Sequence, residues 1–180
     1  MPNLIITKAD LNERNEYVRD ASGVDGHIII EADLGTVLFK GAVRARLSVT
    51  AKAGSGIEAG DGIEAGDGIE AGWGIKAGWG IKAGSGIKAG DGIEAGDGIE
   101  AGSGIEAGDG IEAGSGIEAG DGIEAGLSIT AEWVSAGLRI FAGICSWRLP
   151  EPGEDEIRAE LRGGTVGFGK HVPPAPGEAA

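Results

Sequence analysis

Residues 55–126 read SGIEAG-DGIEAG-DGIEAG-WGIKAG-WGIKAG-SGIKAG-DGIEAG-DGIEAG-SGIEAG-DGIEAG-SGIEAG-DGIEAG, which is twelve consecutive copies of a six-residue unit. Every copy has an isoleucine at the same place, and an alanine follows two positions later with one charged residue between them. Apolar residues two apart are typical of a short strand with one buried face. The Gly-x-Gly segment between strands suits a tight corner, because glycine accepts backbone conformations closed to other residues. Three-residue strands joined by three-residue corners cannot build a flat sheet of long strands, and they predict an all-β, single-stranded parallel β-helix.

Two other interpretations of the same composition are disorder and an α-helix. Glycine makes up 37 of the 180 residues and 24% of the residues are charged, as in many low-complexity chains. A disordered chain has no need of a bulky β-branched residue at every sixth position, so we expect an ordered structure. Two glycines in every six residues exclude a helix. The single cysteine excludes a disulfide framework, and the period of six excludes collagen.

The charged positions indicate that three hexads form one triangular turn of about 18 residues. The three lysines of the repeat, Lys76, Lys82 and Lys88, occupy consecutive copies and therefore fall within one turn. Neighbouring strands are about 4.8 Å apart, so each lysine is within ion-pair reach of a glutamate in the turn before and in the turn after. Local duplication of one copy would produce the same triplet, so the triplet supports this period without proving it. The sequence leaves the handedness of the coil open.

The flanking segments are expected to extend the coil and to close its ends. The predicted hairpin consists of two strand-like stretches on either side of Gly163-Gly164, and the predicted tail is rich in proline. We predict four parts: an N-terminal capping segment over 1–26, the β-helix over 27–147 with its regular repeats at 55–126, a C-terminal β-hairpin cap over 148–172, and a disordered tail over 173–180.

The Ile-x-Ala-Gly-x-Gly unit resembles the hexapeptide-type repeats of single-stranded β-helix proteins, and Gly-Ile-Glu-Ala resembles the repeats of bactofilins. The resemblance covers the repeat and concerns architecture. For bactofilins it also implies assembly of subunits end to end. The chain departs from the hexapeptide acyltransferase pattern, which has a small residue two positions before the aliphatic one, whereas this chain has Asp, Ser or Trp there.

The sequence contains no constellation of catalytic residues, and we expect no enzyme activity, no cofactor and no metal site. Hexapeptide acyltransferases use a histidine as general base, but His27 and His171 both lie outside the regular repeat and are interpreted as surface or cap residues. Cys145 lies in an apolar run and is predicted to be a buried structural thiol. The aspartates of the Gly-Asp-Gly corners are interpreted as solvated residues rather than calcium ligands.

The chain is strongly acidic, and the repeat carries most of the charge. The formal net charge is −14, of which the repeat contributes −12. Stacked like charges cost stability, so we expect this charge to attract a basic protein surface, such as that of a nucleic-acid-binding complex, which the rod would occupy as a mimic of nucleic acid. An inhibitor of such a complex, for example in phage counter-defence, fits this hypothesis. The alternative is that the carboxylates only keep the rod soluble. The predicted acidic ladder has no basic residue within it and consists of Glu94, Glu100, Glu106, Glu112, Glu118, Glu124, Asp91, Asp97, Asp109 and Asp121.

Two tryptophans interrupt the corner pattern. Trp73 and Trp79 occupy corners that otherwise hold Asp or Ser, and Lys76 and Lys82 follow them. Exposed tryptophan beside charge is typical of a binding hot spot, and a lysine ammonium can lie over an indole ring. We predict that these four residues contact a partner or form a dimer contact. Packing of the rings on neighbouring glycine corners is the alternative.

Other features concern the cellular setting. No apolar stretch is long enough to cross a membrane, and the N-terminus has no signal-peptide pattern. We therefore expect a cytoplasmic monomer or homodimer that binds neither membranes nor nucleic acid directly. A self-assembling scaffold, as the bactofilin resemblance implies, is the first alternative function. An enzyme similar to hexapeptide acyltransferases is the second.

Overall fold

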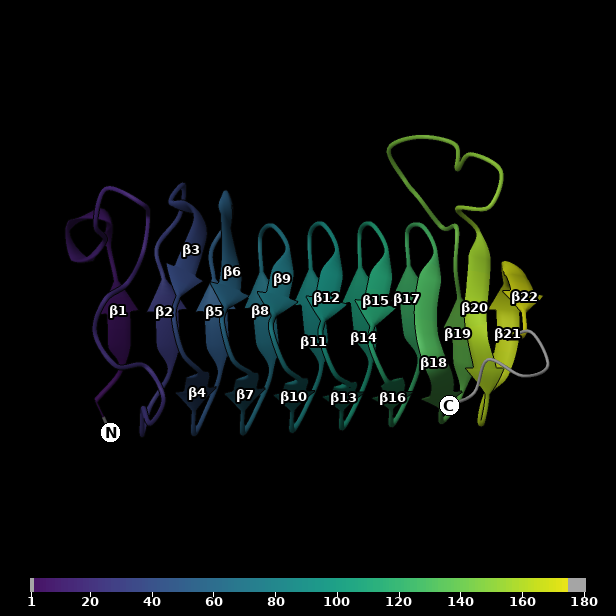
Figure 1. Ribbon diagram of the computed structural model, residues 1–180, viewed down its shortest axis with the longest axis horizontal. Coiled ribbons are helices and arrows are strands. Elements are labelled where there is room, and N and C mark those ends of the chain that lie inside the picture. Colours follow the sequence, from purple (N-terminus) through teal and green to yellow (C-terminus); the bar gives the residue numbers. More distant parts are fainter. Residues whose placement is uncertain (1, 175–180) are drawn as a thin grey trace.

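The computed structural model describes residues 2–174 and consists mostly of short strands joined by tight corners (Figure 1). The strands wind into a parallel β-solenoid of about eight turns with about 18 residues per turn, as the sequence predicts. Near the N-terminus the chain also forms a short 3-10 turn, η1 (Lys8–Asp10). Strand β1 lies at one end of the rod, and β21 and β22 lie at the other (Figure 1).

Three faces of a triangular prism are formed by these strands. The first face contains β1 (Leu4–Ile6), β2 (Ile28–Ile30), β5 (Val49–Ala51), β8 (Ile69–Ala71), β11 (Ile87–Ala89), β14 (Ile105–Ala107), β17 (Ile123–Ala125), β19 (Arg139–Phe141) and β21 (Thr165–Phe168). The second face contains β3 (Gly35–Phe39), β6 (Ser55–Ala59), β9 (Ile75–Ala77), β12 (Ile93–Ala95), β15 (Ile111–Ala113) and β22 (Lys170–Val172). The third face contains β4 (Val43–Ala45), β7 (Ile63–Ala65), β10 (Ile81–Ala83), β13 (Ile99–Ala101) and β16 (Gly116–Ala119). Two longer strands bend around a corner and belong to both the second and the third face: β18 (Ile129–Ala136) and β20 (Glu156–Leu161).

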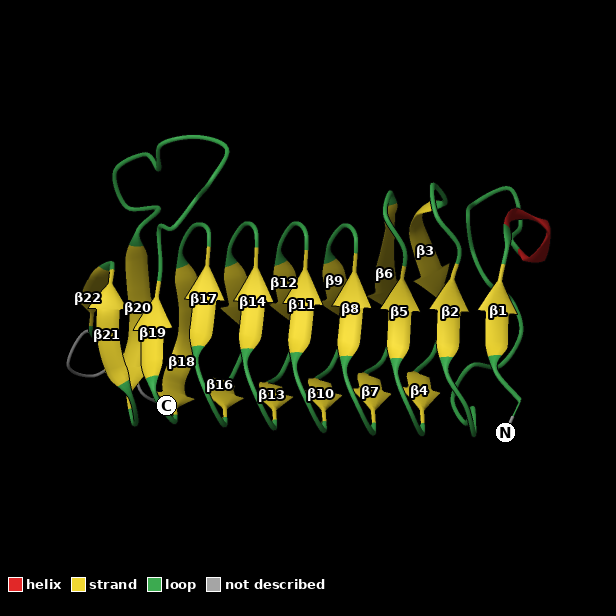
Figure 2. Ribbon diagram, turned by 180° about the vertical axis from the view of Figure 1, so that it is seen from behind, coloured by secondary structure: helices red, strands yellow, loops and turns green. Residues whose placement is uncertain are grey.

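We call the corner between the first and second faces the first edge, the corner between the second and third faces the second edge, and the remaining corner the third edge. In Figure 2 the strands of the first face point upwards in the foreground. The chain then crosses the top, at the first edge, and descends behind while each turn advances from β1 towards β21. This winding is right-handed, which is the handedness that crossovers between parallel strands almost always have.

The interior of the prism is filled by stacked isoleucine and alanine side chains. Every isoleucine of the repeat is at most 1% exposed, and every alanine of the repeat is at most 5% exposed. Identical residues stack on one another, so that Ile93 pairs with Ile75 in the turn before and with Ile111 in the turn after. Because burial of an isoleucine side chain contributes about 1.5–3 kcal/mol, this column is the main source of stability of the regular turns.

The two glycines of each hexad differ in their surroundings. A Cβ atom at Gly102, which follows an alanine, would lie 2.1 Å from the carbonyl oxygen of Gly84 in the preceding turn. A Cβ atom at Gly104, which precedes an isoleucine, would lie 3.3 Å from the carbonyl oxygen of Gly122. Neither glycine has a positive φ. The glycine after alanine is therefore required by the close approach of successive turns, and not by the conformational freedom of glycine that the repeat was expected to need.

The prediction of a C-terminal hairpin is wrong. β20 pairs in parallel with β18, and β21 pairs in parallel with β19 in another face. Gly163 and Gly164 form a further corner of the solenoid, where the Arg162 N–H donates to the Val134 carbonyl of an earlier turn. The alternation of apolar residues did not distinguish the two arrangements, because strands of a hairpin and strands of a coil share a period of two.

The boundaries at both ends also differ from the prediction. The segment 1–26 does not form a separate cap, because β1 continues the first face and Val24 forms a bridge to Ala45, which makes an irregular first turn. The solenoid continues to Val172, and residues 142–155 leave it as a loop between β19 and β20 (Figure 1). From position 175 onward, the predicted tail over 173–180 lies outside the described residues.

Candidate binding surface

Each face carries a column of outward-pointing side chains from the middle positions of its strands. The strand register places every lysine of the repeat between two glutamates, one in the turn before and one in the turn after: Glu58–Lys76–Glu94 on the second face, Glu64–Lys82–Glu100 on the third, and Glu70–Lys88–Glu106 on the first. This arrangement confirms the prediction that the lysine triplet occupies a single 18-residue turn.

All three lysines bond to the glutamate of the following turn. The distance from the Nζ atom to the nearest carboxylate oxygen is 2.6 Å for Lys76–Glu94, 2.8 Å for Lys82–Glu100 and 2.7 Å for Lys88–Glu106. The hydrogen bond to this carboxylate, and then its charge, raise the pKa of each ammonium group. The side chains of these pairs are about half exposed and screened by solvent, so each pair contributes little to stability. The ion pairs therefore define the charge pattern more than they stabilise the fold.

The six glutamates of the predicted acidic ladder do not form a single column. The structure divides them into three stacked pairs, one on each face: Glu94–Glu112, Glu100–Glu118 and Glu106–Glu124. In each pair the first glutamate also bonds a lysine. The second glutamate of each pair, namely Glu112, Glu118 or Glu124, has a glutamate as its neighbour in the preceding turn.

The aspartates of the ladder lie on the edges of the prism. Asp91 and Asp109 follow one another on the first edge, where the Asp109 N–H donates to the Asp91 carbonyl. Asp97 lies on the second edge and Asp121 on the third. Among residues 2–174, no group of three acidic, histidine or cysteine side chains is arranged to hold a metal ion.

The sign of the charge changes from turn to turn rather than from face to face. Residues 73–90 form one turn, here called the lysine turn, whose charged residues are all lysines. Residues 91–126 form the next two turns, here called the acidic belt, and their ten charged residues are all acidic. The six glutamates are distributed over the three faces, and the four aspartates lie on the edges. A partner would therefore meet negative charge from any side of the belt.

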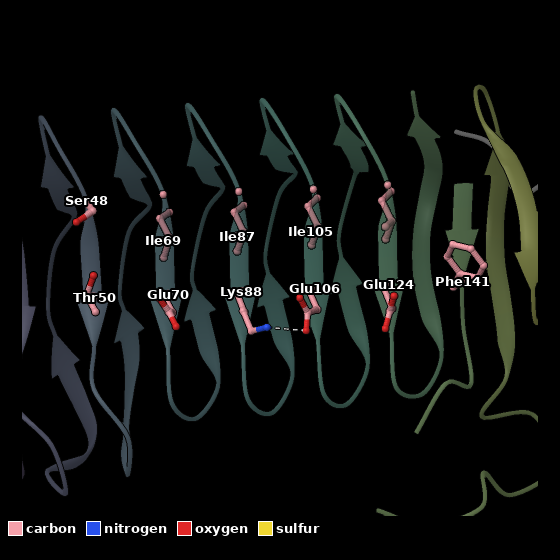
Figure 3. A pocket seen from close by; sticks show the side chains of 15 residues that line it. Ser48, Thr50, Ile69, Glu70, Ile87, Lys88, Ile105, Glu106, Glu124 and Phe141 are labelled. Atoms are coloured by element: carbon pink, nitrogen blue, oxygen red, sulfur yellow. Dashed lines mark hydrogen bonds and ion pairs between the residues drawn. The ribbon is translucent and has the colours of Figure 1, made fainter. Parts of the chain in front are cut away.

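A shallow groove runs along each face beside the charged column. On the first face it has a volume of about 580 Å³, and Glu70, Lys88, Glu106 and Glu124 stand in a row along it (Figure 3). The corresponding grooves have volumes of about 350 Å³ on the second face and 470 Å³ on the third. Each groove is lined by the glycines that precede the isoleucines, because these positions have no side chain to fill the space. The grooves are not among the features predicted from the sequence, although the recurrence of this glycine in every hexad is a signal for them.

The two tryptophans of the lysine turn lie on different edges. Trp73 is on the first edge and is 44% exposed, whereas Trp79 is on the second edge and is 58% exposed. A Cβ atom at Gly35 would lie 3.7 Å from the Trp73 ring, so this indole packs partly on a glycine corner. Trp79 lines the groove of the third face together with Lys82. The two rings and the lysines therefore do not form one patch.

The lysines do not cover these rings. The ammonium groups of Lys76 and Lys82 lie on glutamates of the following turn. Within residues 2–174 the cation–π contacts involve arginines and other rings: Arg19 over Tyr17, Arg148 over Trp147, and Arg162 over Trp133. The Trp79 ring therefore has no cation–π contact within the described residues, although Lys82 lines the same groove.

An exposed apolar loop was not expected from the sequence. Residues 142–155 project from the first edge near the C-terminal end of the rod (Figure 1). Trp147 and Leu149 are 62% and 90% exposed, and Cys145 is only partly buried. The prediction that Cys145 is a buried structural thiol is therefore wrong, because the apolar run leaves the solenoid instead of entering its core.

An ion pair braces this loop. The Arg148 guanidinium bonds the Glu154 carboxylate, with an Nη2–Oε1 distance of 2.7 Å, and lies 4.8 Å from the centre of the Trp147 ring. The Glu151 N–H donates to the same carboxylate. The hydrogen bond from Arg148 and then that from Glu151 lower the pKa of Glu154 from 4.5 to about 2.

The lowered pKa of Glu154 predicts a loop that opens in acid. Since the carboxylate is the form favoured in the folded loop, its contribution is present above pH 4.5 and is lost as the pH falls towards about 2. We expect the fluorescence of Trp147 to change over this interval and the change to be absent in Glu154→Gln. The same fluorescence change in a Trp147→Phe variant would contradict this prediction.

The two histidines lie at opposite ends of the rod and do not share a cleft. The Nδ1 atom of His27, beside β2, is 2.7 Å from the Ser48 hydroxyl. The Nε2–H of His171, in β22, donates to the Ala159 carbonyl at 2.9 Å. Each imidazole is therefore bonded within its own end of the solenoid.

The fold and the charged surface define this chain as a right-handed β-solenoid with an acidic belt. Comparison of the sequence and structure with protein-family models, with curated proteins and with solved structures gave no significant match. None of the helical segments in the described part of the chain has the length and apolar character needed to span a membrane.

Proposed function

We propose that this β-solenoid is a non-catalytic binding protein whose acidic belt engages a basic protein surface in place of nucleic acid. The observation that carries the proposal is the concentration of ten acidic side chains in two successive turns that contain no basic residue. The partner that fits this chemistry is a protein with a basic, nucleic-acid-binding groove.

The carboxylates of the belt are held in a fixed array. Each glutamate stands between a buried isoleucine and a buried alanine of the same strand, as Glu112 does between Ile111 and Ala113. Glutamates of successive turns are separated by the strand spacing of about 4.8 Å. Because the array is already ordered, a partner binds it without the entropy loss of fixing a flexible chain.

The density of charge supports a comparison with nucleic acid. Two turns extend about 10 Å along the axis, and they carry ten negative charges distributed around the rod. Duplex DNA carries one negative charge per about 1.7 Å of its axis. The belt therefore offers at least as much charge per length to a groove that surrounds it.

The stacked glutamates also lower the stability of the fold, and a role in binding would explain why they are present. Like charges directly opposite one another in a sheet are destabilising, and the belt contains three such glutamate pairs. The lysine turn has the same backbone with the opposite charge, so the fold itself does not require glutamate at these positions.

Charge reversal with a matched control tests the proposal. A basic partner is captured from the source cell at about 50 mM salt, is released at about 500 mM salt, and is then purified for affinity measurements. We expect reversal of Glu112, Glu118 and Glu124 to lysine to weaken binding about 100-fold or more. The control is reversal of Glu58, Glu64 and Glu70, which occupy the same three columns three turns earlier, on the other side of the lysine turn. We expect this control to have a smaller effect. Equal effects of the two triple reversals would contradict a role for the belt.

A self-assembling scaffold is the second candidate, and the ends of the first face favour it. β1 and β21 are the outermost described strands of this face, so their outer backbone groups are available for pairing. Ile5 and Phe168, which point outward from these strands, are 52% and 54% exposed. Sedimentation velocity distinguishes this candidate, because end-to-end contacts give particles that keep growing with concentration.

A further inference from the structure

The outward column of the third face differs from those of the other two faces. It begins with Arg44 and continues with Glu64, Lys82 and Glu100, so that four successive turns alternate in sign. In the turn that contains Arg44, the corresponding positions hold Leu38 on the second face and Thr50 on the first, so the alternating part of these columns has only three members. Only the third face therefore has an even number of alternating charges.

An even alternating column is complementary to its own antiparallel copy. Consider a two-fold axis that runs along the strands of the third face and passes between the turns of Glu64 and Lys82. Glu64 then faces Lys82 of the second copy, and Arg44 faces Glu100 of the second copy. The symmetry repeats both contacts, which gives four pairs of opposite charge, and such an interface is closed because the same patch serves both molecules.

The other faces do not offer this arrangement. With three alternating members, a two-fold axis through the centre places lysine on lysine and glutamate on glutamate. If the two-fold axis instead passes between the lysine and a neighbouring glutamate, each of these faces forms only two pairs of opposite charge. In a parallel dimer each charged residue faces the same residue of the second copy, so that like charges oppose each other on all three faces.

We propose that the third face is a dimer interface that binds a second, antiparallel copy of this chain. The four side chains of the column are about half exposed and available for such contacts. Within one chain, Arg44 already pairs with Glu64, and Lys82 with Glu100, so the dimer extends each pair into a network of alternating charges. A network of this kind is stronger than isolated surface pairs but remains sensitive to salt.

The Trp79 ring supplies an apolar contact to the same interface. It stands at the second edge, lines the groove of the third face and is 58% exposed. In the antiparallel dimer the second edges of the two copies lie together, and Trp79 is opposite the turn of Gly62 in the second copy. Gly62 belongs to the glycine row of the groove, which leaves space for an indole ring. This contact accounts for tryptophan at a corner that holds Asp or Ser in ten of the twelve hexads.

Sedimentation equilibrium of the full chain at about 50 mM and about 500 mM salt tests the proposal. We expect a dimer at low salt whose dissociation constant rises about tenfold or more at high salt. Lys82→Glu places glutamates opposite each other at the centre of the interface and is expected to give a monomer. The double exchange Glu64→Lys with Lys82→Glu restores opposite charges across the two-fold axis and is expected to restore the dimer.

The other faces provide matched controls within the same turn. Lys76→Glu and Lys88→Glu each break an equivalent ion pair on another face and are expected to leave the dimer intact. Trp79→Ser is expected to weaken the dimer about tenfold or more, whereas Trp73→Ser, on the first edge, is expected to leave it unchanged. A monomer at low salt, equal effects of the three lysine reversals, or failure of the double exchange to restore the dimer would each overturn the proposal. The dimer and the acidic belt share Glu100, but their tests are separable, since reversal of Glu112, Glu118 and Glu124 leaves the four-charge column intact.

Discussion

Gly102→Ala is expected to destabilise the solenoid by about 3 kcal/mol or more, because the new methyl group would lie 2.1 Å from the Gly84 carbonyl oxygen. The obstacle is backbone, which cannot rotate away as a flexible side chain can. The two turns would have to separate at that corner, and the neighbouring isoleucine contacts would loosen with them. Urea denaturation followed by circular dichroism measures the loss.

Gly104→Ala is the matched control in the same corner. Its methyl group would lie 3.3 Å from the Gly122 carbonyl oxygen, a contact that a small backbone shift relieves. Alanine also restricts the unfolded chain, which favours folding by about 0.4–1 kcal/mol where it fits. We therefore expect a change within about 1 kcal/mol of zero. If the two variants unfolded at the same urea concentration, close approach of the turns would not be the reason for the glycine after alanine.

Ile99→Ala is expected to cost about 2–5 kcal/mol, because Ile99 is fully buried in the middle of the rod between Ile81 and Ile117. The cavity interrupts contacts with both neighbouring turns. In a solenoid each turn contacts only its neighbours, so we expect the loss to weaken the coupling between the two halves of the molecule. Native-state hydrogen exchange across residues 81–119 measures this local effect.

Two further variants test whether the cavity at Ile99 causes the loss of stability and whether its effect stays local. Ile99→Val removes one methylene group and is expected to cost about 0.5–1.5 kcal/mol. Ile157→Ala makes the same change near the C-terminal end, where the inward column continues to His171 in the outermost described strand of that face. We expect its effect to be confined to the last turns. An effect of Ile157→Ala on hydrogen exchange of the central turns would contradict nearest-neighbour coupling.

The sequence predicts the regular part of the fold well, because apolar and charged residues recur there at the same positions of every hexad. The isoleucine and the alanine of each hexad define which face of the strand is buried, and the lysine triplet defines how many hexads complete a turn. The observed pairing of Lys82 with both Glu64 and Glu100 confirms this inference. The contacts follow from register alone, so no tertiary information was needed to predict them.

Other features depend on information that the pattern does not contain. The strands on either side of Gly163 and Gly164 have the alternation of a hairpin, and only their pairing partners, β18 and β19, show that they are successive faces of the coil. The apolar run around Cys145 lies in a loop that leaves the coil, and the ion pair of Arg148 with Glu154, which braces this loop, cannot be inferred from the alternation of residues. The grooves arise from positions without side chains, and the alternating column of the third face includes Arg44, which lies outside the regular repeat.

Successive turns are in register, as the pairing of Ile75 with Ile93 shows. The length of the rod therefore increases in proportion to the number of 18-residue repeats. Duplication of three hexads would add one increment of about 4.8 Å to the rod and would keep every later residue on its original face. Duplication of a single hexad would instead rotate everything downstream by a third of a revolution and carry each later side chain to an adjacent face. The length of the rod between the lysine turn and the projecting loop can therefore change in increments of one turn, while the structure of both ends stays the same.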